Sequence, residues 1–259
     1  MLLHCLNDDR RKLPTRAHAQ GLMREKSSSI KKVLILVTIL AVPGFLYYLL
    51  QEKGKNRYKP LHIYGPKQVA ATFHSVRGNQ IPDTIYHEVQ DFKLVNQAGD
   101  TLSFENYKGK ILILNLFYTQ GNNYAVNFAN KAMHAFDFTY EKNKAVHFIS
   151  LSIDPVTDKP EVLAPYAKKQ EAKAGKWDML TGDSTQMFNF INKGLLVDAL
   201  QENVAGQKKF TYSNMFVLLD THHRIRGYYE ATTQEALSKL DDEIKVLLAE
   251  ELRNINDGR

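Results

Sequence analysis

Apolar residues are concentrated in one long segment near the start of the chain. Residues 33–50 form eighteen consecutive residues without a charge, preceded by Lys31-Lys32 and followed, after Gln51, by Glu52-Lys53. At about 1.5 Å per residue, such a helix can just cross a hydrocarbon core of roughly 30 Å. A cleaved signal peptide fits less well, because the run is long and no small-x-small cleavage motif follows it. We therefore predict a transmembrane anchor from Val33 to Leu50.

Downstream of the anchor, short apolar runs of strand length alternate with segments of helical periodicity. The run at 111–117 is almost entirely apolar, as expected for a central strand that is covered on both faces. The pattern predicts strands at 91–95, 101–104, 111–117, 146–153, 177–180, 215–219 and 225–229, and helices at 126–142, 160–174, 184–193 and 233–252. This order predicts an α/β domain at 67–259, with a mixed central sheet that carries helices on both faces and a linker at 51–66.

Charge changes the picture of the N-terminal region more than that of the domain. Residues 1–32 contain eight basic and three acidic residues, together with a run of three serines, and predict a disordered basic tail. Residues 61–259 carry 22 basic and 24 acidic residues, so the net charge of +6 belongs to the flanks of the anchor. Nothing in the domain indicates a nucleic-acid partner.

The orientation of the anchor does not follow from charge alone, because basic residues stand on both sides of it. A short tail followed by a large folded domain is the usual arrangement of a signal anchor. We therefore expect a single-pass membrane protein with its domain on the extracytoplasmic, periplasmic side. Met23 precedes a normal short leader, so both Met1 and Met23 are candidate translation starts.

Candidate catalytic chemistry is scarce. The motifs of serine hydrolases, phosphate-binding loops and paired-histidine zinc sites are missing from the sequence, and its single cysteine is Cys5, upstream of the anchor. Disulfide exchange and peroxidase chemistry both need a thiolate nucleophile. His222 and His223 lie in a predicted turn, where adjacent side chains diverge, and we expect them to be solvated. We predict that the protein is not an enzyme.

Residues 60 to about 248 resemble the SCO/SenC family. The matching segments, in order, are Ile63-Tyr64-Gly65-Pro66, Asp91-Phe92 with the following Asn96-Gln97, Lys108-Gly109-Lys110, Phe117-Tyr118-Thr119, Ser152-Ile153-Asp154-Pro155, Thr181-Gly182-Asp183 and Arg224-Ile225-Arg226-Gly227-Tyr228-Tyr229. The resemblance implies a thioredoxin-like fold. It also implies a copper chaperone that takes part in assembly of the binuclear copper centre of cytochrome c oxidase.

The family has a Cys-x-x-x-Cys after the Phe-x-Thr segment and a histidine before a later strand. In this sequence the cysteine positions fall on Gly121 and Ala125, and the histidine position falls on Tyr212. Two thiolates and an imidazole suit Cu(I), whereas Gly and Ala offer no side-chain donor and a phenol of pKa near 10 is a poor partner. We expect a divergent member that binds no copper cofactor at these positions.

Polar and aromatic residues replace the ligands. They form a candidate binding surface of Tyr118, Gln120, Asn122, Asn123, Tyr124, Tyr212 and Asn214. Tyr and Asn are typical of recognition surfaces, but they are also common turn residues, so drift after loss of the site is the competing interpretation.

These residues favour a non-catalytic binding or accessory factor in oxidase assembly. Its partner would be an oxidase subunit, a metallochaperone or an active SCO-like relative. The alternatives are a copper chaperone or thioredoxin-like oxidoreductase that uses unconventional His or Met ligands, and a decaying paralogue without a selected task.

Overall fold

The computed structural model describes residues 17–53, 60–76, 78–121, 124–204 and 206–256. The chain divides into two compact units, Met1–Arg57 and Tyr58–Arg259, and each is described by itself.

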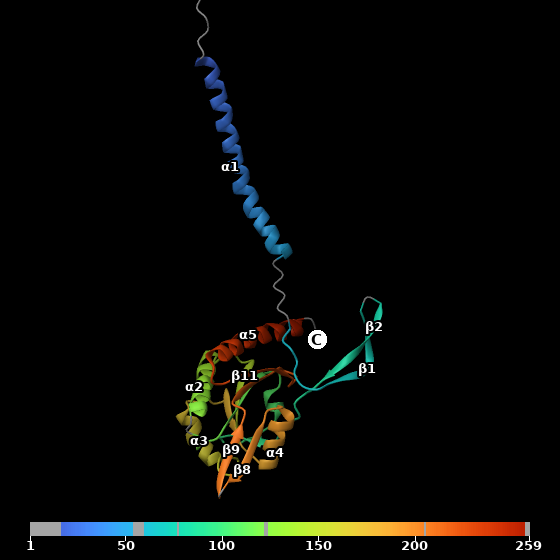
Figure 1. Cartoon of the computed structure of the whole chain (residues 1–259), viewed down its shortest axis with the longest axis vertical. Coiled ribbons are helices and arrows are strands. Elements are labelled where there is room, and N and C mark those ends of the chain that lie inside the picture. Colours follow the sequence, from blue (N-terminus) through green and yellow to red (C-terminus); the bar gives the residue numbers. More distant parts are fainter. Residues whose placement is uncertain (1–16, 54–59, 77, 122–123, 205, 257–259) are drawn as a thin grey trace, which may run out of the picture. The chain divides into compact units, whose positions relative to one another are not determined.

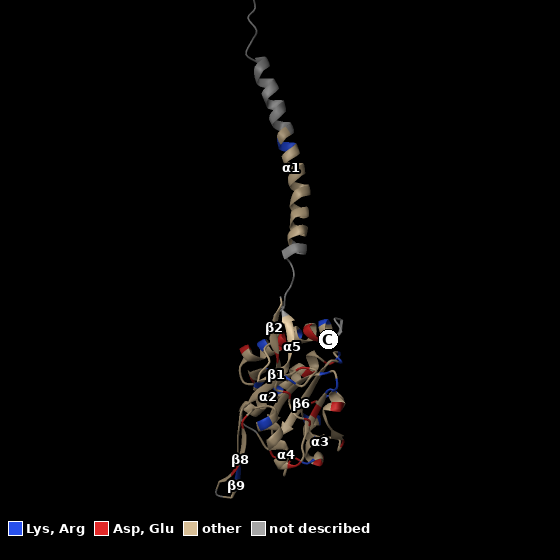
Figure 2. Ribbon diagram, turned by 90° about the vertical axis from the view of Figure 1, so that its right-hand side faces the viewer, with Lys and Arg blue, Asp and Glu red and all other residues tan. Residues whose placement is uncertain are grey.

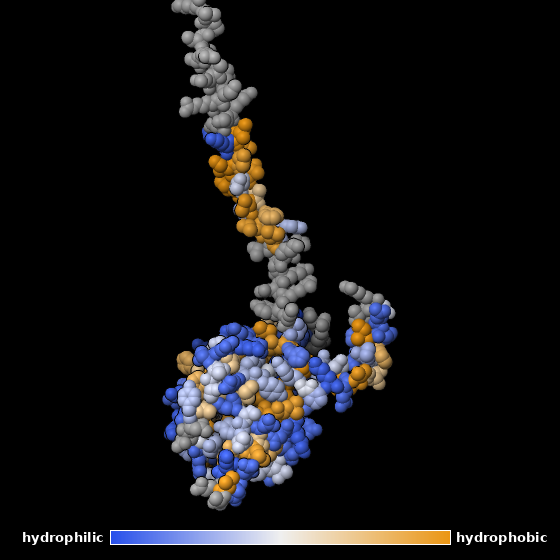
Figure 3. Space-filling model, viewed as in Figure 1, coloured by the Kyte–Doolittle hydropathy of each residue, from blue (hydrophilic) through white to orange (hydrophobic). Residues whose placement is uncertain are grey.

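The first unit contains one long helix, α1 (Ala17–Lys53) (Figure 1). Its stretch Ile30–Leu49 is 20 residues long and apolar enough to cross a membrane, and Figure 3 shows apolar side chains along this part of the helix. The predicted span at 33–50 therefore coincides with a helix of suitable length.

The disordered tail expected at residues 1–32 is corrected from Ala17 onward, because residues 17–32 are helical. The physical reason is that this segment is rich in Ala, Leu, Met, Gln, Glu, Lys and Arg, which favour helix, and that extending a helix is much easier than nucleating one. Residues 1–16, which include Cys5, lie outside the described residues.

The second unit is built on a five-stranded sheet with the strand order β11-β10-β5-β6-β7. Strands β5 (Ile111–Phe117), β6 (Val146–Ser152) and β7 (Trp177–Leu180) are parallel, whereas β10 (Met215–Leu219) and β11 (Ile225–Glu230) add an antiparallel edge. Every residue of β5, β6 and β7 is buried, as their nearly continuous apolar sequences predict. The predicted mixed sheet is confirmed.

Alternate residues of β5 face two separate apolar cores. Ile111 and Ile113 pack with helices α2 (Tyr124–Thr139), α3 (Pro160–Lys169) and α5 (Gln234–Asn256). Leu112 and Leu114 pack on the other face, with α4 (Ser184–Asn189), the π turn Phe190–Gly194 and the segment that precedes β5. The predicted helices on both faces of the sheet are therefore confirmed (Figure 1).

Several elements end earlier or later than their sequence patterns predict. Strand β3 is only Leu94–Val95, paired with β4 (Thr101–Leu102), because the Asp91 side chain accepts hydrogen bonds from two backbone amides and starts a loop instead. Helix α3 ends at Lys169 rather than 174, since Glu171 adopts a left-handed conformation with φ 57°. Helix α4 begins as predicted, with the Asp183 side chain accepting a hydrogen bond from the amide of Gln186.

The sequence pattern did not predict two hairpins. One joins β1 (Lys67–Val76) to β2 (Asn79–Tyr86), and the other joins β8 (Ala199–Val204) to β9 (Gln207–Tyr212). Each pairs only within itself, and most of its described residues are exposed. The β1–β2 hairpin has no buried residue among those described, whereas β8–β9 packs on the core through Ala199, Phe210 and Tyr212. With so few buried positions, the alternation of apolar and polar residues that marks a half-buried strand is weak.

A buried arginine joins the start of the domain to its last strand and last helix. The guanidinium of Arg226 donates to the carbonyl of Leu61 at 2.8 Å, to Asp220 at 3.0 Å and to Glu250 at 2.8 Å. Nearby, the amide of Tyr64 donates to the carbonyl of Ile225 at 2.8 Å. The linker expected at 51–66 is therefore corrected: residues 51–53 are helical, residues 54–59 lie outside the described residues, and the chain from Leu61 is part of the domain.

The surface of the domain carries charges of both signs. Figure 2 shows Lys and Arg mixed with Asp and Glu over the elements, as the balanced count for residues 61–259 predicts.

Candidate functional site

The candidate site lies at the carboxyl end of the parallel strands, and we call it the mouth. It consists of residues 118–121 and 124–125 between β5 and α2, the loop 153–158 that follows β6, and residues 210–214 at the end of β9. The amide of Ile153 donates to the carbonyl of Phe117 at 2.9 Å, which holds the two loops side by side. In doubly wound α/β sheets the carboxyl ends of the strands are where ligands bind.

A buried aspartate fixes the backbone of the mouth. Asp158 is 1% exposed and accepts hydrogen bonds from the Thr119 amide at 3.1 Å, from the Thr119 hydroxyl and from the Ser152 hydroxyl at 2.6 Å. The sequence patterns did not single out this residue, because its partners are 6 and 39 residues away. Asp158 is therefore a positioning residue for the loop that carries Tyr118 and Gly121.

A lysine from the β8–β9 hairpin closes one side of the mouth. Lys208 Nζ lies 2.8 Å from Asp154 Oδ1 and 3.1 Å from Thr157 Oγ1. The Asp154 carbonyl also accepts the backbone amides of Thr157 and Asp158. Asp154 thus has a supporting role in a turn, and it holds the hairpin against the loop.

An aromatic ring occupies the space next to Gly121. A Cβ atom at position 121 would lie 3.0 Å from Tyr118 Cε1 and 3.0 Å from Val126 Cγ2, closer than carbon atoms normally pack. Gly121 is not among the glycines with positive φ, so contact with these neighbours rather than backbone strain is what disfavours a side chain here. The first family ligand position therefore has neither a donor nor room for one without movement of Tyr118.

The third family ligand position lies in a cluster of aromatic rings. The Tyr118 ring is 5.1 Å from the Phe210 ring and 6.3 Å from the Tyr212 ring, centroid to centroid. Burial, together with the neighbouring Tyr118 and Tyr166 hydroxyls, raises the pKa of Tyr212 to about 12. The Tyr212 phenol is therefore neutral near pH 7, and a neutral phenol is a poor ligand for Cu(I).

The structure brings together only part of the predicted binding surface. Tyr118 and Tyr212 are half-buried neighbours, and Gln120 is exposed beside them. Tyr124 is 72% exposed at the start of α2, with its ring 5.7 Å from that of Phe128. Ala125, the second ligand position, is half-buried behind it.

Two predicted surface positions lie outside the described residues, Asn122 and Asn123. Asn214 is half-buried, its amide nitrogen is inaccessible, and its backbone carbonyl accepts the amide of Ala231. Asn214 therefore offers no accessible amide nitrogen to a partner.

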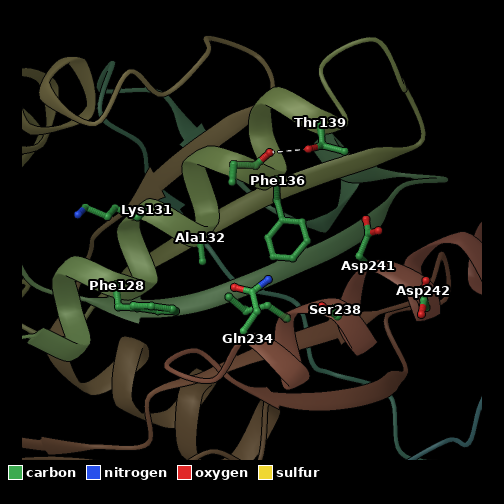
Figure 4. A pocket seen from close by; sticks show the side chains of 11 residues that line it. Phe128, Lys131, Ala132, Phe136, Thr139, Gln234, Ser238, Asp241 and Asp242 are labelled. Atoms are coloured by element: carbon green, nitrogen blue, oxygen red, sulfur yellow. Dashed lines mark hydrogen bonds between the residues drawn. The ribbon is translucent and has the colours of Figure 1, made fainter.

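A groove of about 600 Å³ runs between α2 and α5 and begins at Phe128, next to Tyr124 (Figure 4). In Figure 4, Phe128 and Phe136 on α2 lie opposite Gln234 and Ser238 on α5. Nothing in the sequence patterns predicted this groove, because each helix has an ordinary amphipathic pattern.

The histidines of the domain are dispersed rather than gathered at the mouth. His147 is buried, with Nε2 2.8 Å from Asp178 Oδ2, and burial lowers its pKa although Asp178 raises it. His134 pairs with Glu171 at 3.1 Å. His223 was expected to be solvated, but its ring stacks on Phe104 at 3.8 Å; its left-handed conformation, φ 56°, turns the side chain inward. Among the described residues, one group of three His, Asp or Glu side chains lies close enough to hold a metal ion, at Asp220, His222 and Glu251.

Comparison with known proteins gives a consistent match. The sequence model of the SCO1/SenC family matches residues 82–247. A curated relative from Bacillus subtilis, "SCO1 protein homolog", is 26% identical over 172 residues, which cover 65% of this chain and 86% of the relative. The "SCO2-like protein RT0576" of Rickettsia typhi is 23% identical over 220 residues, which cover 83% of this chain and 99% of the relative.

Solved structures show the same fold. A SCO1/SenC family lipoprotein from Bacillus anthracis superposes with a TM-score of 0.55 at 22% identity, covering 62% of this chain and 95% of that one. Arabidopsis thaliana ScoI with copper bound superposes with a TM-score of 0.51 at 20% identity, covering 64% and 98%. The thioredoxin-like fold implied by the resemblance is thus confirmed.

Proposed function

This chain belongs to the SCO1/SenC family, and from that premise we propose that it is a membrane-anchored, non-catalytic accessory factor in assembly of the copper centre of a respiratory oxidase. A solved relative is described as a member of the Sco family of cytochrome c oxidase assembly proteins. The proposal keeps the family's setting but assigns this chain a binding task instead of copper transfer at the mouth.

The observation that carries the proposal is the side-chain content of the mouth. Gly121 and Ala125 have no donor atoms, and the ring of Tyr118 packs where a side chain at position 121 would lie. Tyr212 has its pKa raised to about 12 by burial, so it offers a phenol rather than an imidazole or a thiolate. These residues do not fit Cu(I), which favours thiolates, and they provide no nucleophile for thiol chemistry.

The surface that replaces the ligands supports a binding task. Tyr124 is exposed at the first position of helix α2, and Gln120 is exposed on the loop before it. Tyr side chains combine apolar area with a hydrogen-bonding hydroxyl and lose little conformational entropy on binding, as in many recognition surfaces. We propose that this surface engages an oxidase subunit, a metallochaperone or an active SCO-like relative on the periplasmic side of the membrane.

A copper titration tests the negative half of the proposal. The full chain carrying Cys5→Ser, which removes its single thiol, is titrated with Cu(I) against a competing chelator in detergent without oxygen. We expect no affinity above that of the unfolded chain. Tight one-to-one binding would refute the proposal and favour the alternative, a copper chaperone that uses unconventional His or Met ligands.

A co-purification experiment tests the positive half. Membranes that contain the tagged chain are solubilised mildly, and oxidase subunits and SCO-like relatives are quantified with the wild type, Tyr124→Ala and the double variant Tyr124→Ala with Tyr212→Ala. Phe138→Ala is the matched control, since Phe138 is 68% exposed on the same helix, away from the mouth. We expect the single and double tyrosine variants to lose a partner that the wild type and Phe138→Ala retain. Equal recovery from all four proteins would reject this surface.

A further inference from the structure

A second cluster of ligand-type side chains lies at the end of the sheet opposite the mouth. Asp220 and His222 belong to the turn between β10 and β11, and Glu251 comes from the last turns of α5. One ligand atom from each of the three lies within 4.8 Å of the others. Leu219 pairs with Leu112 at the start of β5, whereas the mouth follows the end of that strand, so the two places are separate.

Glu251 is a buried carboxylate with one oxygen that lacks a hydrogen-bond donor among the described residues. The residue is 8% exposed, and its Oε2 accepts the hydroxyl of Thr221 at 2.8 Å. Its Oε1 is inaccessible and has no donor in the described part of the chain. Burying a carboxylate oxygen without a donor or a cation is unfavourable.

The two arginines nearby are already committed to other carboxylates. Arg224 Nε lies 2.8 Å from Asp220 Oδ2, and Arg226 bonds both Asp220 and Glu250. Three carboxylates therefore face two guanidinium groups, and the charge that is left without a hydrogen-bonded cation is that of Glu251. The local balance favours one further positive charge at Glu251.

We propose that His222 and Glu251 bind a divalent transition-metal cation at this turn. Imidazole nitrogen and carboxylate oxygen are ligands that Zn²⁺, Ni²⁺ and Cu²⁺ accept. The Thr221 hydroxyl links the two ligands, because it lies 3.4 Å from His222 Nδ1 as well as 2.8 Å from Glu251. With metal–ligand bonds of about 2.0–2.2 Å, the ligand atoms must lie roughly 3–4 Å apart. His222 is exposed, so a rotation of its side chain can close that distance.

Asp220 supports this site without being a free ligand. Its Oδ1 accepts the amides of His222 at 3.0 Å and Arg224 at 2.9 Å, and its Oδ2 accepts both arginine side chains. Four donors occupy its lone pairs. Asp220 therefore fixes the turn that presents His222 and adds negative potential beside the cation.

Cobalt binding gives a direct test. The full chain in detergent is titrated with Co²⁺, and the visible absorption of bound Co²⁺ reports nitrogen and oxygen coordination; Zn²⁺ is then added as a competitor. We expect one equivalent that Zn²⁺ displaces. His222→Ala and Glu251→Gln each remove a proposed ligand. Each should weaken binding by at least about tenfold, because the loss of a residue that merely supports a ligand already costs that much at known sites.

His134→Ala is the matched control, since His134 also pairs with a glutamate, but that partner, Glu171, is exposed whereas Glu251 is buried. It should leave the titration unchanged. Fluorescence of the single tryptophan, Trp177, which is fully buried, confirms that each variant is folded. Absence of a Co²⁺ spectrum, or equal affinity of the His222→Ala variant and the wild type, would overturn the proposal. His222 is exposed, so its replacement keeps the test valid if Glu251→Gln does not fold.

Discussion

The closeness of Tyr118 to Gly121 predicts a measurable coupling between the two positions. In Gly121→Ala the new Cβ would lie 3.0 Å from Tyr118 Cε1 and 3.1 Å from its Cζ. Carbon atoms pack best at about 3.5–4.0 Å, so the contact is short by roughly half an ångström or more.

The expected loss of stability follows from two opposing effects. Overpacking of this kind typically destabilises by about 1–3 kcal/mol. Replacing Gly by Ala reduces the entropy of the unfolded chain and returns about 0.4–1 kcal/mol. We therefore expect Gly121→Ala to lower the free energy of unfolding by about 1 kcal/mol.

A double-mutant cycle with Tyr118→Ala isolates the contact. Removing the ring frees the space, so in that background Gly121→Ala should be neutral or stabilising. The difference between the two backgrounds is expected to be about 1 kcal/mol or more, above the usual limit of additivity for independent sites. Urea unfolding followed by Trp177 fluorescence measures each corner of the cycle, since this tryptophan is buried in the core.

The same loss in both backgrounds would refute the reasoning, because it would mean that Tyr118 does not occupy the space beside position 121. Val126 Cγ2 is equally close to the new Cβ. A residual loss in the Tyr118→Ala background that disappears with Val126→Ala would assign that part of the crowding to Val126.

Two further predictions concern buried charge. Arg226→Met should lower the free energy of unfolding by about 3–5 kcal/mol, because it leaves Asp220 and Glu250 without their shared partner. Urea unfolding measures this loss, and a change below 1 kcal/mol would contradict it. Burial lowers the pKa of His147, so the unfolded chain gains a proton first and stability should fall as the pH drops below about 6.5. Between about pH 7.5 and 5 the free energy of unfolding should depend less on pH in His147→Gln than in the wild type. The same dependence in both proteins would contradict the assignment.

The parts of the fold that the sequence predicts well are those buried on both faces. Ile111–Phe117 and Trp177–Leu180 have the predicted bounds, because a strand covered on both sides must be apolar along its whole length. The β1–β2 and β8–β9 hairpins were not predicted for the opposite reason. The two strands of each hairpin pair only with one another, and most of their residues are exposed to water. With few buried positions, little period-2 pattern is imposed on the sequence.

At the mouth, the sequence identifies which side chains are present but not what they touch. The positions of Gly121, Ala125 and Tyr212 follow from the resemblance, whereas the packing of Tyr118 beside Gly121 depends on a ring orientation that no pattern encodes. The contact between Lys208 and Asp154 joins residues 54 positions apart.

The turn between β10 and β11 shows the same limit. The contact of Thr221 with Glu251 spans 30 residues, and its two ends belong to segments that look unremarkable separately. Such long-range polar contacts arise only once the sheet and helix α5 are packed.

The bonds of Arg226 to Leu61, Asp220 and Glu250 determine how mechanical load would enter the domain. A force applied through the chain before Leu61 would reach strand β11 and helix α5 at the same time, because one guanidinium group joins all three segments. The amide of Leu61 also donates to Glu250 and that of Tyr64 to Ile225, so a pull on this segment would load several hydrogen bonds. The segment 61–64, at the end of the domain that follows helix α1 in the chain, is therefore tied to the rest of the domain at several points.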